Sequence, residues 1–252
     1  VVNNACDDHT DDVVRSFETR LPLRLLHEPR PGKNRALNHA LESCRPCDAM
    51  VFTDDDVTPC GGWLMAIRDA VSRWPDHDAF GGRIVPLWPD GIKPEWIREP
   101  WLLSVGFAWH DLGSSETPYP TGIYPFGPNF WVRGSVFQNG LRFEEAIGPT
   151  GNSRIMGSET SFLKVLAQRG HPMIHSPTAS VGHRIKPADC DPHVLARRMH
   201  SHGRGRARIH GVNYRNLLTN HPWRWQARQR TKLVIEHTQL MLASLLPANS
   251  AR

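Results

Sequence analysis

Residues 49–56 read AMVFTDDD, and this stretch decides the fold expected for the whole chain. The apolar run 49–52 has the length of a buried strand, and a proline and two glycines within residues 59–62 mark a turn soon after it. This pattern places three carboxylates at the carboxyl end of a strand. In open α/β sheets that edge is where ligands bind.

The three carboxylates are those of Asp54, Asp55 and Asp56, and they repel one another unless a cation neutralises them. Hard oxygen ligands of this kind suit Mg2+ or Mn2+, and a bound cation could hold a diphosphate. Taken alone, the triplet favours a solvated acidic turn over a metal site.

Several motifs together resemble the nucleotide-sugar domain of family 2 glycosyltransferases. They are PGKNRALNHAL at 31–41, VFTDDDVTP at 51–59 with Trp63-Leu64, Gly157-Ser158-Glu159-Thr160, and Val181-Gly182-His183. Their order and spacing match that family from Val1 to about Gly205. Together they are far more specific than any one motif alone.

The resemblance implies an α/β protein with a GT-A-like nucleotide-diphospho-sugar transferase fold, in which a mainly parallel sheet is flanked by helices. This domain is expected at residues 1–186, followed by a basic helical tail at 187–252. Residues 1–4 resemble the second strand of the family, so the first strand and helix are expected to be missing. A helix is predicted to begin near Val13, with Asp11 or Asp12 as its cap.

Composition is that of an ordinary globular chain. The 252 residues are 39% hydrophobic and 22% charged, which favours one domain, or one domain and a tail. No apolar run approaches the ~20 residues of a membrane span. Five cysteines, an odd number, do not form a disulfide framework, which fits the reducing cytosol and predicts a cytoplasmic protein.

The net charge of +5 is concentrated near the carboxyl end, where residues 184–232 hold twelve Lys or Arg against two Asp. Basic residues interleaved with aromatics suit a helix that lies in the membrane interface. This pattern predicts that the tail binds an anionic membrane surface, at the inner face of the membrane. The early arginines alternatively neutralise a diphosphate or are solvated, and without a recognisable motif no nucleic acid is expected. The residues concerned are Arg197, Arg198, Arg204, Arg206, Arg208, Trp223, Arg224, Trp225 and Lys232, before the apolar segment 233–246.

A donor site follows from the resemblance. Asn3 stands where the family has an Asp that binds the base, and Asp54 and Asp55 fall in the donor-binding triplet. Lys33 and Arg35 open a helix predicted over 33–44, where their charges and the free N–H groups face a diphosphate, unless they are merely a solvated basic helix start.

A second donor-binding element is the stretch from Gly127 to Asn129, which resembles the family's Gly-x-Asn beside the donor sugar. Glycine allows close backbone approach, and an amide both donates to and accepts from a sugar hydroxyl. The loop 86–124 is rich in proline and tryptophan. Its tryptophans either stack on sugar rings or form ordinary core. They are Trp88, Trp96, Trp101 and Trp109.

Glu159 is the candidate catalytic base, because forming a glycosidic bond by direct displacement requires a carboxylate beside the acceptor hydroxyl. The family usually has Glu-Asp where this chain has Ser158-Glu159, so a longer side chain takes the place of the Asp. Alternatively, Glu159 simply caps a helix. His183 is expected to ligate a metal opposite Asp56, or else to be structural.

The resulting hypothesis is a metal-dependent, inverting glycosyltransferase that moves a sugar from a UDP- or GDP-sugar donor to a glycan or lipid-linked acceptor. Its cofactor is Mg2+ or Mn2+, held by Asp56 and His183. Two alternatives stay open: a non-catalytic remnant that binds nucleotide sugar, and a different metal-dependent phosphotransfer enzyme that uses the acidic triplet.

Overall fold

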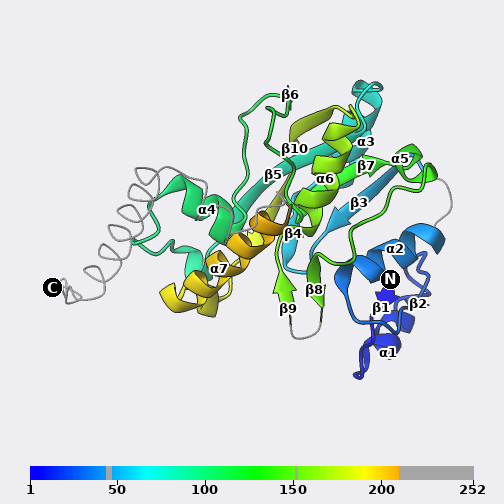
Figure 1. Ribbon diagram of the computed structural model, residues 1–252, viewed down its shortest axis with the longest axis horizontal. Coiled ribbons are helices and arrows are strands. Elements are labelled where there is room, and N and C mark those ends of the chain that lie inside the picture. The colour runs from blue at the N-terminus through cyan, green and yellow to red at the C-terminus, as the bar shows by residue number, and fades with distance from the viewer. Residues whose placement is uncertain (44–46, 151–152, 210–252) are drawn as a thin grey trace, which may run out of the picture.

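The structure is a computed structural model that describes residues 1–43, 47–150 and 153–209. Within these residues the centre is a six-stranded sheet in the order β3-β7-β5-β10-β4, with β6 paired to β10 (Figure 1). The strands are β3 (Ala49–Thr53), β4 (Val57–Pro59), β5 (Ala79–Leu87), β6 (Thr117–Pro118), β7 (Asn129–Arg133) and β10 (Met173–Arg184).

Pairing in this sheet is mixed, which corrects the prediction of a mainly parallel sheet. Strand β7 lies antiparallel between β3 and β5, and both β4 and β6 are antiparallel to β10. Strands β5 and β10 are parallel. Because β7 is buried along most of its length, its apolar run looks like that of a parallel strand, and the sequence alone does not reveal its direction.

Two small sheets accompany the large one. Strands β1 (Val2–Asn3) and β2 (Leu26–His27) form a parallel pair, and β8 (Gly148–Thr150) and β9 (Ser153–Ile155) form an antiparallel pair. The strand predicted at the amino end is confirmed.

Helices occupy most of the predicted positions. The described residues form α1 (Thr10–Arg15), α2 (Lys33–Ser43), α3 (Trp63–Arg73), α4 (Pro100–Phe107), α5 (Ser135–Gln138), α6 (Ser158–Gln168), α7 (Pro192–Ile209), and the 3-10 turns η1 (Pro89–Gly91) and η2 (Pro187–Cys190). The predicted cap of α1 is wrong, because His9 is the N-cap and Asp11 and Asp12 lie in the first turn.

Side chains on the two faces of the sheet build two hydrophobic clusters. On one face α6 packs through Phe162, Leu163 and Leu166 against β5 and β7, and Phe52 stacks on Phe130 with 4.6 Å between ring centroids. On the other face α3 covers Phe80 and Trp131. Alternate strand residues point to opposite faces, so the large sheet is buried between helices.

The loop 86–124 folds into a third cluster, and its tryptophans divide accordingly. Trp88 and Trp96 pack against buried Phe107 and Leu195. These two tryptophans are therefore part of the hydrophobic core, as one of the two interpretations of the sequence predicts. Trp101 is half exposed.

Helix α7 continues the packed domain beyond residue 186. Arg198 donates to the carbonyl of Gly106 and to Asp189 Oδ1, at 2.8 and 2.7 Å. Gly205 lies so close to the backbone of Met156 that no side chain fits there. Residues 192–209 are therefore helical and packed on the fold, and the predicted division of the chain at residue 186 stays a prediction.

The rest of the predicted tail, 210–252, lies outside the described residues, and its membrane surface stays a prediction. Among the described helices, none combines the length and the apolar character needed to cross a bilayer.

Candidate functional site

The acidic triplet forms the turn between β3 and β4, at the sheet edge that the sequence predicts. Strand β4 then pairs with the end of β10, and in this register Val57 lies opposite His183. Arg184 secures the turn, because its backbone N–H donates to the carbonyl of Asp56 and its guanidinium to the carbonyl of Asp55. Two motifs separated by more than a hundred residues therefore meet here.

Asp56 and His183 face each other, with 3.4 Å between Asp56 Oδ2 and His183 Nε2. Nδ1 of His183 lies 3.1 Å from the carbonyl oxygen of Phe107. A carbonyl only accepts, so Nδ1 donates to Phe107 and Nε2 is the ring atom that faces the carboxylate. An imidazole nitrogen and a carboxylate oxygen are both metal ligands, so this pair could hold a divalent cation.

The other oxygen of this carboxylate, Asp56 Oδ1, is buried and has no hydrogen-bond partner in the described part of the chain. A buried acceptor without a partner is costly, and a divalent ion bound there would satisfy it. Across the described ranges no three His, Cys, Asp or Glu converge as a metal site. This donor set fits Mg2+ or Mn2+, which take few protein ligands and complete their shell with water and substrate phosphates.

Lys33 lies at the centre of the site. Its Nζ is 2.6 Å from Glu159 Oε1 and 3.2 Å from Asp54 Oδ1. Burial opposes its charge, but the negative charges of Glu159 and Asp54 outweigh burial and hold the pKa of Lys33 above its ordinary value. The ammonium is a permanent cation between the triplet and the candidate base.

Glu159 lies in the first turn of α6, which begins after Gly157 in a left-handed conformation at φ 104°. Its carboxylate points to Lys33 instead of capping the helix. On its other side lies Gly127, where a Cβ would stand 2.9 Å from the carboxyl carbon of Glu159. The predicted base and the predicted glycine are therefore neighbours.

A buried hydrogen-bond cluster beneath these residues is one that the sequence did not predict. The Ser158 hydroxyl donates to Asn34 Oδ1, and Asn34 Nδ2 donates at 2.7 Å to the carbonyls of Glu144 and Ile147. Both Asn34 and Ser158 are buried.

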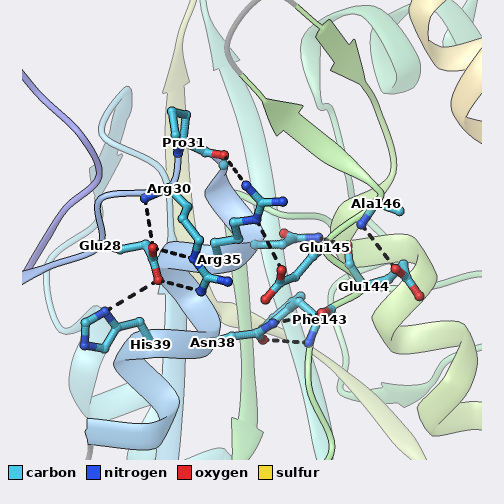
Figure 2. Close-up of polar contacts among 12 residues, drawn as sticks. Glu28, Arg30, Pro31, Arg35, Asn38, His39, Phe143, Glu144, Glu145 and Ala146 are labelled. Atoms are coloured by element: carbon cyan, nitrogen blue, oxygen red, sulfur yellow. Dashed lines mark hydrogen bonds and ion pairs between the residues drawn. The ribbon is translucent and has the colours of Figure 1, made fainter.

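Asn38 extends this cluster by exchanging two hydrogen bonds with the backbone of Phe143 (Figure 2). The signal was available, since two asparagines four residues apart lie on one helix face.

Arg35 points away from Lys33. It lies 3.2 Å from Glu145 and donates to the carbonyl of Pro31 (Figure 2). The guanidinium of Arg35 therefore lies beside the loop 143–147, and its charge is paired with the carboxylate of Glu145.

Glu28 lies near Arg35 and is buried, and hydrogen bonds from Arg30 lower the pKa of Glu28 to about 2.

Asn3 and Asn129 do not present their amides to a ligand. Asn3 donates to Asp11 and accepts from the backbone N–H of Cys6. Asn129 is fully buried; it donates to two backbone carbonyls and accepts from the indole of Trp63. Both amides hold the fold together, because their hydrogen-bonding capacity is taken by protein groups.

His110 lies behind the Gly127 segment. Its ring stacks on Phe126, with 4.5 Å between centroids, and its Nε2 lies 2.7 Å from the hydroxyl of Tyr119. Burial lowers the pKa of His110 to about 4, so the ring is neutral at physiological pH. It supports, as a neutral group, the residue that precedes Gly127.

No protein-family model matches the chain, but a curated protein and some solved structures are similar to it. A glucosyl-dolichyl phosphate glucuronosyltransferase from Haloferax volcanii is 25% identical over 139 residues, 55% of this chain and 43% of that protein. The mannosyltransferase PcManGT from Pyrobaculum calidifontis, solved with GDP-Man and Mn2+, superposes with a TM-score of 0.52 at 21% identity.

That superposition covers 79% of this chain and 50% of the mannosyltransferase. GalNAc-T7, solved with UDP, GalNAc and Mn2+, superposes with a TM-score of 0.51 at 11% identity, over 73% of this chain and 37% of its own. The chain thus spans half or less of the length of these relatives. It has the mixed α/β GT-A fold of glycosyltransferases.

Proposed function

We propose that this protein transfers a sugar from a nucleoside-diphosphate sugar to an acceptor hydroxyl, with inversion at the sugar carbon and with Mg2+ or Mn2+ as cofactor. One observation carries the proposal: Lys33 joins Asp54 to Glu159, while Asp56 meets His183. Four motifs thus supply the proposed base, a cation and the proposed pair of metal ligands at one edge of the sheet.

Glu159 acts as the general base. As the acceptor oxygen attacks the sugar carbon, the bond from that carbon to the diphosphate breaks, and the hydroxyl proton passes to the carboxylate. A single displacement on the face opposite the leaving group inverts the carbon. The longer Glu in place of the family's Asp is accommodated because Gly127 has no side chain.

Asp56 and His183 would hold the metal ion, which neutralises charge on the leaving diphosphate when bound. Asp54 and Asp55 contribute to the donor site at the same turn. Arg35 also lies in the first turn of α2, where free N–H groups favour an anion, and its guanidinium would have to leave Glu145 to reach a diphosphate. Asn3 and Asn129 support the site from within the fold.

Donor and acceptor classes follow from the relatives. GDP-Man and UDP are the nucleotides named with PcManGT and GalNAc-T7, so GDP- and UDP-sugars are the donors to test. The name of the Haloferax relative contains a lipid-linked sugar, glucosyl-dolichyl phosphate. We therefore propose a glycan or lipid-linked acceptor.

The test is a donor screen that measures release of GDP or UDP, with Mn2+ or Mg2+ and with sugar and lipid-linked acceptors. The protein should release nucleotide only with metal and acceptor present, and Glu159→Gln should abolish release. Glu95→Gln, an exposed carboxylate elsewhere, is the matched control and should keep full activity.

Two results would contradict the proposal. Tight binding of a nucleotide sugar with Mn2+ but no transfer to any acceptor would fit a non-catalytic binding module. Hydrolysis of a phosphomonoester without a sugar acceptor would fit a phosphotransfer enzyme.

A further inference from the structure

Two consecutive residues of α2 contact two consecutive residues of α6. Lys33 pairs with Glu159, and Asn34 bonds Ser158, although the pairs are more than 120 residues apart in sequence. From this arrangement we infer that Lys33 is a positioning residue, which aims the carboxylate of Glu159 at the acceptor instead of binding the donor diphosphate. The inference rests on the proposed function.

The ammonium of Lys33 is committed to two carboxylates. It donates to Glu159 Oε1 at 2.6 Å and to Asp54 Oδ1 at 3.2 Å. All three side chains are partly buried, with relative exposures of 36% for Lys33, 20% for Glu159 and 33% for Asp54. At such exposure the pair is screened less by water than a surface ion pair.

Without Lys33 the two carboxylates would repel each other. Both now contact the same ammonium, so they lie close together, and like charges at short range disfavour the arrangement. The backbones of both residues are held, Asp54 in the turn after β3 and Glu159 in α6, but the Glu159 side chain is the longer one and so has the larger range of movement. The cation therefore keeps the candidate base next to the acidic triplet.

The backbone beneath Glu159 is already fixed by other contacts. Asn34 bonds Ser158 and, through its Nδ2, two carbonyls of the loop 144–147, which anchors the start of α6. Only the side-chain torsions of Glu159 remain to be set. Gly127 limits them on one side and Lys33 on the other.

A role in aiming the base predicts a particular kinetic signature. An interaction needed only as the proton is transferred lowers kcat and leaves donor affinity unchanged, whereas a contact to the diphosphate would weaken donor binding. Misplacing a catalytic group by about 1 Å can cost on the order of 100-fold in rate.

The experiment compares Lys33→Met, Lys33→Arg and the control Arg68→Met, an exposed cation on α3 that is paired with Asp69. We expect Lys33→Met to lower kcat by about 100-fold. Its Kd for the donor with Mn2+, measured by calorimetry, should stay within about threefold of wild type. Lys33→Arg keeps the charge, and its kcat should be at least about tenfold higher than that of Lys33→Met. Arg68→Met should match wild type in both.

A rise in donor Kd that accounts for the whole loss of kcat/KM would overturn the inference, and so would full activity of Lys33→Met. Urea unfolding of Lys33→Met, Glu159→Gln and the double variant tests the contact without turnover. We expect non-additivity of at least about threefold in the unfolding equilibrium constant. Additive effects would also overturn it. If wild type transfers no sugar but the coupling is present, the proposed function fails and the contact stands.

Discussion

Gly127 lies against Glu159 so closely that a methyl group on its α-carbon would stand 3.0 Å from the carboxylate oxygen Oε1. Its backbone is not among the positive-φ glycines, so alanine is allowed there by the backbone. The Glu159 side chain is flexible and would give way before the backbone does. Glycine at this position thus reserves space for the candidate base.

We predict that Gly127→Ala lowers kcat by at least about tenfold while the thermal midpoint changes little, because a flexible carboxylate is displaced and no core group is lost. Steady-state kinetics and thermal unfolding check this. Gly61→Ala is the control, since a Cβ there meets no described atom within 4 Å. If Gly127→Ala has the kinetics of wild type, the carboxylate of Glu159 does not need its position beside residue 127 for catalysis.

Asp56→Asn should weaken Mn2+ binding in the presence of GDP or UDP by at least about tenfold, because the variant removes the charge that faces His183. Calorimetry measures this, and Asp69→Asn on α3 is the matched control. Unchanged Mn2+ affinity would exclude Asp56 as a ligand.

Asn34→Ala should destabilise the protein by about 2–4 kcal/mol, because two buried carbonyls and one buried hydroxyl lose their partner. Urea denaturation measures the change. Asn139→Ala, at an exposed position, should stay within about 0.5 kcal/mol of wild type. A loss of comparable size in both variants would remove the special role of Asn34.

Stability should fall in acid partly because of His110. Its pKa is lowered to about 4 by burial, from an ordinary value of 6.5, so the unfolded chain binds the extra proton between these pH values. The stabilisation is complete above about pH 6.5 and decreases as the pH falls towards 4.

Relative to His110→Gln, which cannot titrate, wild type should lose up to about 3 kcal/mol between pH 7.5 and pH 4. Urea midpoints at several pH values give both curves. Parallel curves for wild type and variant would mean that the ring is already protonated in the folded state or that it titrates normally.

The sequence predicted the parts of this fold whose signals are local. The apolar run before the triplet predicted β3, and the helix predicted over 33–44 is α2, which ends at Ser43. The direction of β7 was missed because burial on both faces hides it. The helix α4 was missed because proline and tryptophan mask its short apolar segment.

The site was predictable as a set of motifs but not as a set of contacts. Resemblance pointed to Glu159, Asp56 and His183, and the structure brings them to one edge. The resemblance could not reveal that the amide of Asn129 donates to two backbone carbonyls of the fold. An Asn that binds a sugar and an Asn that binds the backbone look alike in sequence. Nor could it reveal Lys33 as the link, because that contact spans 126 residues.

Such long-range closure also bears on how the molecule folds. Contacts between distant segments form late and slowly, because a large loop must be ordered before they contribute energy. The contacts that join Lys33 to Asp54 and Glu159 should therefore not exist in partly folded chains that contain only α2 or only α6. A nucleotide that binds only the assembled site would favour the native topology and shift the folding equilibrium towards it by mass action.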